Sequence, residues 1–178
     1  MLRNLDLMAC AKPPSVMGLG WKENKTYKTI DSVIKVLIVE DNPGDIMLMQ
    51  DALEGDETID VIDVVKNGEE AIRYLKQQGE FQEKTRPNLV ILDINLPRVN
   101  GHEVLQFIKN DEKTKETPVV MLSSSSSDED IKASYHHYAN CYVTKPVGLD
   151  NFMEVIREIK DFWLNFVELP DGRSRPQN

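Results

Sequence analysis

Five polar side chains stand directly after short apolar runs of this sequence, and their types suit phosphoryl chemistry. They are three carboxylates, one hydroxyl and one amine: Glu40, Asp41, Asp93, Ser123 and Lys145. Three carboxylates crowded together cannot all stay ionised without a counter-ion. A hard divalent cation such as Mg²⁺, which prefers oxygen ligands and accepts a phosphate among them, would supply one. One carboxylate could then attack phosphorus to give an aspartyl phosphate, while the metal, the amine and the hydroxyl stabilise the phosphoryl oxygens in transit.

The elements that must position these side chains alternate along the chain. Short runs rich in β-branched residues predict buried strands, and the segments between them have the apolar spacing of helices. The predicted strands span 36–39, 59–65, 88–92, 118–122 and 141–144. The predicted helices span 45–53, 67–75 and 101–110, and two more begin near 128 and 149. This alternation predicts an α/β fold: a doubly wound, five-stranded parallel sheet with five helices on its two faces.

In a doubly wound sheet, functional groups gather at the carboxyl ends of the strands. The five polar side chains would therefore share one edge of the sheet. Asp93 closes the central strand, between the acidic pair on one side and Ser123 and Lys145 on the other. This position makes Asp93 the best candidate for the nucleophile.

Local signals refine the predicted helices and loops. Asn67, followed three residues later by Glu70, predicts a capping box at the start of the second helix. Residues 77–86 are interpreted as a polar loop and residues 124–127, all serine, as a flexible one. The last helix carries an apolar stripe whose final part, 162–166, exceeds what one helix end needs for a core and suits a partner surface.

Composition limits the classes of function. The chain has 178 residues and a mass of 20.3 kDa, with 40% hydrophobic residues, which suits one domain with a sizeable core. Its 21 basic and 30 acidic side chains give a net charge of −9, and such a surface repels nucleic acid and anionic membranes. No apolar run approaches the length of about 18 residues that spans a bilayer. Two cysteines without a framework, Cys10 and Cys141, favour a cytoplasmic location.

The residues resemble the receiver domain of two-component response regulators over about 34–166. The matching motifs, each on the expected strand end, are Val39-Glu40-Asp41-Asn42, Leu92-Asp93-Ile94-Asn95-Leu96-Pro97, Gly101, Ser123 and Lys145-Pro146. The intervals also fit, at 30 residues from Asp93 to Ser123 and 22 from Ser123 to Lys145. The interval of 52 residues from Asp41 to Asp93 is long for the family, and we attribute the excess to the 77–86 loop. The amino-acid sequence at 41–45, 95–97 and 140–142 is most similar to that of single-domain regulators that partner phytochrome-type histidine kinases.

The resemblance implies a flavodoxin-like strand order of 2-1-3-4-5 and a division of the chain into three parts. Residues 33–167 would form the receiver domain, between a partly disordered extension at 1–32 and a tail at 168–178. No DNA-binding or catalytic output domain would follow, so the signal would pass through a changed docking surface. A homodimer formed through the last two helices and the fifth strand is a further hypothesis.

The resemblance also implies a role for each site residue. Asp93 would be the phosphoacceptor. Glu40 and Asp41 would bind Mg²⁺, Asp41 more directly, together with Asp93 and the backbone carbonyl of Asn95. Lys145 would pair with a phosphoryl oxygen, and its peptide bond to Pro146 is expected to be cis.

Two further residues would report phosphorylation. Ser123 would swing its hydroxyl toward the phosphoryl group, and Tyr142 would be the aromatic switch coupled to it.

Three other functions compete with this interpretation. A phosphatase or phosphotransferase that uses an aspartyl phosphate would place an acid two residues after its nucleophile, where this chain has Asn95. A flavodoxin-like electron carrier would need a phosphate-cradling loop after the first strand, and a receiver-like scaffold would not need the intact acidic set.

Overall fold

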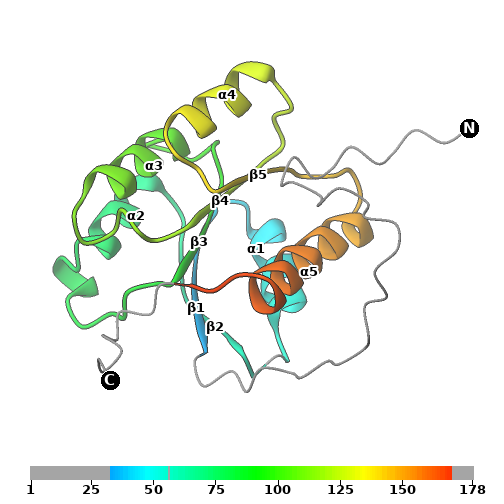
Figure 1. Ribbon diagram of the computed structural model, residues 1–178, viewed down its shortest axis with the longest axis horizontal. Coiled ribbons are helices and arrows are strands. Elements are labelled where there is room, and N and C mark those ends of the chain that lie inside the picture. The colour runs from blue at the N-terminus through cyan, green and yellow to red at the C-terminus, as the bar shows by residue number, and fades with distance from the viewer. Residues whose placement is uncertain (1–32, 56, 170–178) are drawn as a thin grey trace, which may run out of the picture.

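The structure is a computed structural model that describes residues 33–55 and 57–169. The predicted extension at 1–32 and most of the predicted tail at 168–178 lie outside the described residues. The chain alternates strands and helices in the predicted order (Figure 1). The elements are β1 (Ile34–Val39), α1 (Pro43–Leu53), β2 (Ile59–Val65), α2 (Gly68–Leu75), the 3₁₀ helix η1 (Gly79–Phe81), β3 (Leu89–Leu92), α3 (Gly101–Asn110), β4 (Val119–Ser123), α4 (Asp128–His136), β5 (Cys141–Thr144) and α5 (Leu149–Asn165).

All four strand pairings are parallel, and the strands lie in the order β2-β1-β3-β4-β5. This confirms the predicted α/β fold and its strand order. Helices cover both faces, with α1 and α5 together on one and α2 and α3 on the other (Figure 1). The central strands β1, β3 and β4 are predominantly apolar because both of their faces are covered. Within β1, for example, Leu37 and Val39 enter one core and Val36 and Ile38 enter the other.

Side-chain caps decide where the helices begin. Helix α1 starts two residues earlier than predicted, because Asn42 accepts hydrogen bonds from two N–H groups of the first turn and Pro43 suits the first helical position. The capping box predicted for α2 is only half formed. The Asn67 side chain accepts from the Glu70 N–H, but Glu70 accepts in return from the backbone N–H of Lys66. The Glu70 carboxylate therefore reaches one residue beyond the cap.

The 77–86 loop folds against α2 instead of standing free. It contains η1, the Tyr74 hydroxyl donates to the carbonyl of Thr85 at 3.0 Å, and Arg86 donates to the carbonyl of Leu75 at 3.2 Å. The loop joins α2 to the start of β3, so it lies at the amino end of that strand. The additional residues between Asp41 and Asp93 are thus absorbed away from the carboxyl edge.

Candidate functional site

Backbone hydrogen bonds extend the sheet beyond its strands and bring the predicted residues to one edge. The N–H of Glu40 donates to Val65 O at 3.0 Å, and the N–H of Asp93 donates to Val39 O at 2.9 Å. The N–H of Lys145 donates to Ser123 O at 2.7 Å. Strand β4 includes Ser123 itself, because it begins and ends one residue later than the predicted strand. The register of neighbouring parallel strands therefore sets the distances between these side chains.

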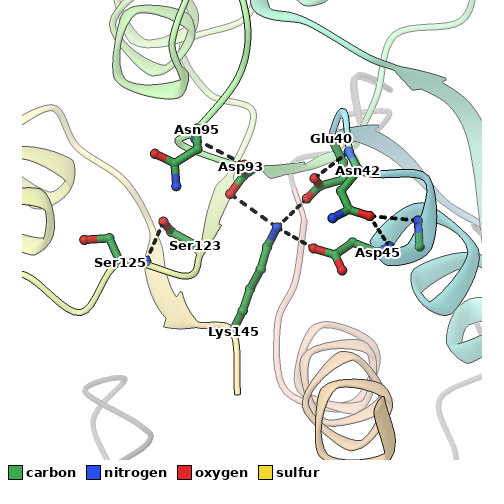
Figure 2. Close-up of polar contacts among 9 residues, drawn as sticks. Glu40, Asn42, Asp45, Asp93, Asn95, Ser123, Ser125 and Lys145 are labelled. Atoms are coloured by element: carbon green, nitrogen blue, oxygen red, sulfur yellow. Dashed lines mark hydrogen bonds and ion pairs between the residues drawn. The ribbon is translucent and has the colours of Figure 1, made fainter. Parts of the chain in front are cut away.

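Lys145 lies at the centre of the site (Figure 2). Its Nζ is 2.6 Å from Glu40 Oε2, 2.9 Å from Asp45 Oδ2 and 3.4 Å from Asp93 Oδ1. The prediction of a cis bond to Pro146 is wrong, since the described residues contain no cis peptide. The trans form is intrinsically favoured by about 0.5–1 kcal/mol even before proline, and Lys145 reaches the carboxylates with that geometry.

The carboxylates of Glu40, Asp41 and Asp93 form one cluster that could hold a metal ion. One oxygen atom from each lies within 4.8 Å of the other two. Glu40 and Asp93 are buried, at 1% and 5% exposure, whereas Asp41 is exposed. Such a set of oxygen donors, two of them withdrawn from water and one open to solvent, suits a hard divalent cation that keeps some of its own water.

Burial dominates the electrostatics of the site. It raises the pKa of Glu40 and of Asp93 above their ordinary values, although the nearby Lys145 ammonium opposes this rise in both. For Lys145 the balance is reversed. Burial alone would lower its pKa, but contacts with Glu40 and Asp45 outweigh burial and raise it above its usual range. The site therefore concentrates negative charge around one persistent ammonium group.

Asp93 combines burial with an open acceptor atom. Its Oδ2 accepts a hydrogen bond from the Asn95 N–H at 3.1 Å, but its buried Oδ1 accepts none from the described residues. A buried oxygen without a hydrogen bond is costly unless a ligand completes it. This atom lies at ion-pair distance from Lys145, so a phosphorus or metal centre arriving there would meet a free lone pair beside a positive charge.

Gly101 holds the backbone around Asp93. A Cβ atom at position 101 would lie 2.1 Å from the Asp93 carbonyl oxygen, so only glycine fits. The Gly101 N–H donates to the carbonyl of Ile94 at 2.9 Å. The start of α3 thus packs directly on the segment that carries the candidate nucleophile.

Ser123 and Tyr142 both contact the loop that follows β4. Ser123 Oγ accepts from the Ser125 N–H at 3.1 Å, and the Tyr142 hydroxyl donates to the Ser125 carbonyl at 2.8 Å. The Ser125 and Ser127 hydroxyls both donate to Asp130 of α4. This loop has more hydrogen bonds than a plain flexible loop would make, and it connects the site edge to α4.

The sequence analysis did not identify one residue of the site, Asp45. Asp45 contacts Lys145 100 positions away, yet in the sequence it is only an acid in the first turn of a helix, where the helix dipole favours acids in general. Neither its type nor its spacing separates it from other first-turn acids. Only the approach of α1 to the end of β5 reveals the contact.

The doubly wound sheet with an acidic cluster and a lysine at its carboxyl edge agrees with the receiver-domain resemblance of the sequence. The family described as the response regulator receiver domain matches residues 36–157, and the chain belongs to that family. The response-regulator function predicted from the motifs is thereby confirmed. No enzyme function is indicated by this family, and no helix within residues 33–55 and 57–169 is long and apolar enough to cross a membrane.

Individual relatives within this family show which response regulators the chain is similar to. It is 39% identical to the response regulator Rcp1 of Synechocystis sp. over 76% of this chain and 92% of that protein. The crystal structure of the phosphorylated cyanobacterial phytochrome response regulator RcpA aligns with a TM-score of 0.75 at 40% identity, covering 79% of this chain and all of that one. The Mn²⁺-bound form of Rcp1 aligns with a TM-score of 0.71 at 39% identity, covering 78% and 99%. The predicted similarity to phytochrome-linked regulators is confirmed.

Proposed function

We propose that Asp93 accepts a phosphoryl group from the phosphohistidine of a histidine kinase. A carboxylate oxygen of Asp93 attacks phosphorus and a P–O bond forms. The P–N bond breaks, its electron pair goes to the imidazole nitrogen, and the imidazole leaves in neutral form with a proton taken from water. Hydrolysis reverses the change, since water attacks phosphorus and releases inorganic phosphate and the Asp93 carboxylate. The observation that carries this proposal is the buried Oδ1 of Asp93, which accepts no hydrogen bond from the described residues and lies 3.4 Å from Lys145.

The proposal includes Mg²⁺ as the cofactor. Asp41, Asp93 and the backbone carbonyl of Asn95 would hold the ion, with Glu40 supporting it from its buried position. The chemistry that Mg²⁺ supplies is neutralisation of the charge that develops on the transferring phosphoryl group. The fit rests on three carboxylates within 4.8 Å of one another, and on the Mn²⁺-bound form of the relative Rcp1.

The same residues would produce the signal. Lys145 pairs with a phosphoryl oxygen, and Ser123 releases the Ser125 N–H to turn its hydroxyl toward the new group. Tyr142, whose hydroxyl donates to the Ser125 carbonyl, then follows the loop. Because Ser125 and Ser127 donate to Asp130, rearrangement of this loop alters the start of α4. The protein catalyses only its own phosphorylation and dephosphorylation.

The partner is a histidine kinase of the phytochrome type, acting in the cytoplasm. RcpA is described as a phytochrome response regulator, and it shares 40% identity with this chain. Exposed apolar side chains flank the site in sequence. Val147, two residues after Lys145, is 94% exposed, and Met47 and Leu149 are also exposed. Apolar side chains beside a charged site suit docking of a protein partner such as the kinase.

A homodimer through α4, β5 and α5 forms part of the proposal. Tyr135, Tyr138 and Phe166 are exposed, Phe166 at 80%. Light scattering should show a dimer, and a monomer both with and without phosphodonor would remove this element of the proposal.

Labelling tests the chemistry. The wild type should become phosphorylated by acetyl phosphate in Mg²⁺, measured as a mobility shift on a phosphate-affinity gel. It should not be labelled when the metal is chelated before acetyl phosphate is added. Asp93→Asn should not be labelled. Undiminished labelling of Asp93→Asn would refute the assignment.

A further inference from the structure

Lys145 is held by a carboxylate that stands outside the acidic cluster. Its Nζ lies 2.9 Å from Asp45 Oδ2, closer than the 3.4 Å to Asp93 Oδ1. Figure 2 shows Asp45 meeting the ammonium from the start of α1, on the side away from Asp93. Asp45 and Glu40 therefore hold the ammonium more closely than Asp93 does.

The start of α1 fixes Asp45 in this position. Asn42 Oδ1 accepts from the Gly44 N–H at 2.8 Å and from the Asp45 N–H at 3.3 Å, and Pro43 begins the helix. The helix dipole favours a negative charge in the first turn. Asp45 is thus held by its own helix, independently of any ion in the acidic cluster.

The contacts imply a competition for the ammonium. Lys145 donates hydrogen bonds to Glu40 and Asp45, while the buried Oδ1 of Asp93 receives none from the described residues. Glu40 belongs to the acidic cluster, so a cation bound there would share its charge. Asp45 lies outside the cluster and keeps its full attraction for Lys145.

We propose that Asp45 is a positioning residue that holds the Lys145 ammonium on the α1 side of the site and so limits its movement to the phosphoryl group on Asp93. This inference rests on the proposed function. A phosphoryl group that arrives at Asp93 must draw the ammonium away from Asp45. The negative charge of Asp45 also repels that of the phosphoryl group, so both effects slow phosphorylation.

Asp45→Asn removes the charge and keeps the size of the side chain. At saturating Mg²⁺ this variant should be labelled by acetyl phosphate about fivefold faster than the wild type, the effect expected from one partly exposed ion pair. Asp51→Asn is the matched control, since it removes the same charge from the far half of the same helix, and it should label like the wild type. Asp45→Glu, which keeps the charge, should stay close to the wild-type rate. Labelling of Asp45→Asn at or below the wild-type rate would overturn the proposal.

Mg²⁺ affinity gives a second measurement that does not depend on phosphorylation. In Asp45→Asn the Lys145 ammonium interacts with Glu40 and Asp93 alone. The cation must contact these same two carboxylates, so it competes with the ammonium for them. Calorimetric titration should therefore show weaker Mg²⁺ binding in Asp45→Asn than in Asp51→Asn. Equal affinity in the two variants would overturn the proposal. Thermal unfolding checks that each variant is folded, and Asp45→Ser, which suits a helix start, replaces Asp45→Asn if the latter does not fold. A wild type that is never labelled would refute the proposed function instead, and the titration would still test the role of Asp45.

Discussion

Replacement of Gly101 by alanine should displace the backbone at Asp93 and so disrupt the site, although position 101 contributes no functional side chain to it. The added Cβ would lie 2.1 Å from the Asp93 carbonyl oxygen and 2.7 Å from the Ile94 Cα, whereas ordinary contacts begin at 3.4 Å. The start of α3 and the Asp93 segment must therefore separate by about 1.3 Å, the difference between 2.1 and 3.4 Å. Both sides of this contact are backbone, so no side-chain rotation can relieve it. Overpacking of this kind typically costs about 1–3 kcal/mol of unfolding free energy.

The larger effect of Gly101→Ala should fall on phosphorylation. Displacement of a reacting group by about 1 Å can cost on the order of 100-fold in rate. We expect Mg²⁺-dependent labelling by acetyl phosphate to fall at least tenfold, together with a melting temperature lowered by several degrees, since about 1 kcal/mol corresponds to a few degrees in a domain of this size.

Gly68→Ala is the matched control for this prediction. Its Cβ would lie 2.1 Å from the Val99 carbonyl oxygen, an equal clash that does not touch Asp93. It should lower the melting temperature to a similar extent but reduce labelling much less. A folded Gly101→Ala that is labelled at the wild-type rate would refute the reasoning, and so would an equal loss of labelling in both variants.

Three further predictions concern charge, docking and the switch. Burial raises the pKa values of Glu40 and Asp93, so the metal-free folded state binds protons more tightly than the unfolded state. The contribution of these two groups to the free energy of unfolding is therefore present at low pH and is lost as pH rises through the raised pKa values. The gain in melting temperature on adding Mg²⁺ should therefore grow over the same pH rise, and a gain that shrinks would contradict this. Val147→Asp should reduce transfer from a phytochrome-type kinase about fivefold, as for one exposed interface residue, without changing labelling by acetyl phosphate; an equal loss with both donors would place Val147 in the chemistry. Tyr142→Phe removes the hydrogen bond to the Ser125 carbonyl, so it should lower the free energy of unfolding by about 1 kcal/mol. It should also increase amide hydrogen exchange in the β4–α4 loop. Unchanged exchange would count against coupling of Tyr142 to this loop.

The sheet and its polar edge could be predicted because both follow from local patterns. A strand covered on both faces must be largely apolar, so runs such as residues 36–39 identify the central strands with little ambiguity. Since all strands run parallel, whatever follows each run must lie at one edge. This rule brings Glu40, Asp93 and Lys145 together without any knowledge of the side-chain contacts.

The remaining features depend on how elements approach one another. The contact of Asp45 with Lys145 requires the first turn of α1 to meet the end of β5, and no periodicity encodes that meeting. The hydrogen bonds that link Ser125 and Ser127 to Asp130 arise because the loop returns over the start of α4, while the sequence shows only a run of serines. For Gly101, the resemblance indicated a position, but the close contact with the Asp93 carbonyl gives the physical reason for a glycine there.

The most direct test of the account is to locate the phosphoryl group itself. The wild type is phosphorylated with acetyl phosphate in Mg²⁺, the acyl phosphate is reduced with borohydride, and the modified residue is identified by mass spectrometry of the digested protein. Our account predicts that residue 93 alone is converted, from aspartate to homoserine, and that chelation of the metal before phosphorylation abolishes the conversion. Conversion at another carboxylate, or none at Asp93 in a sample that carries the label, would contradict it.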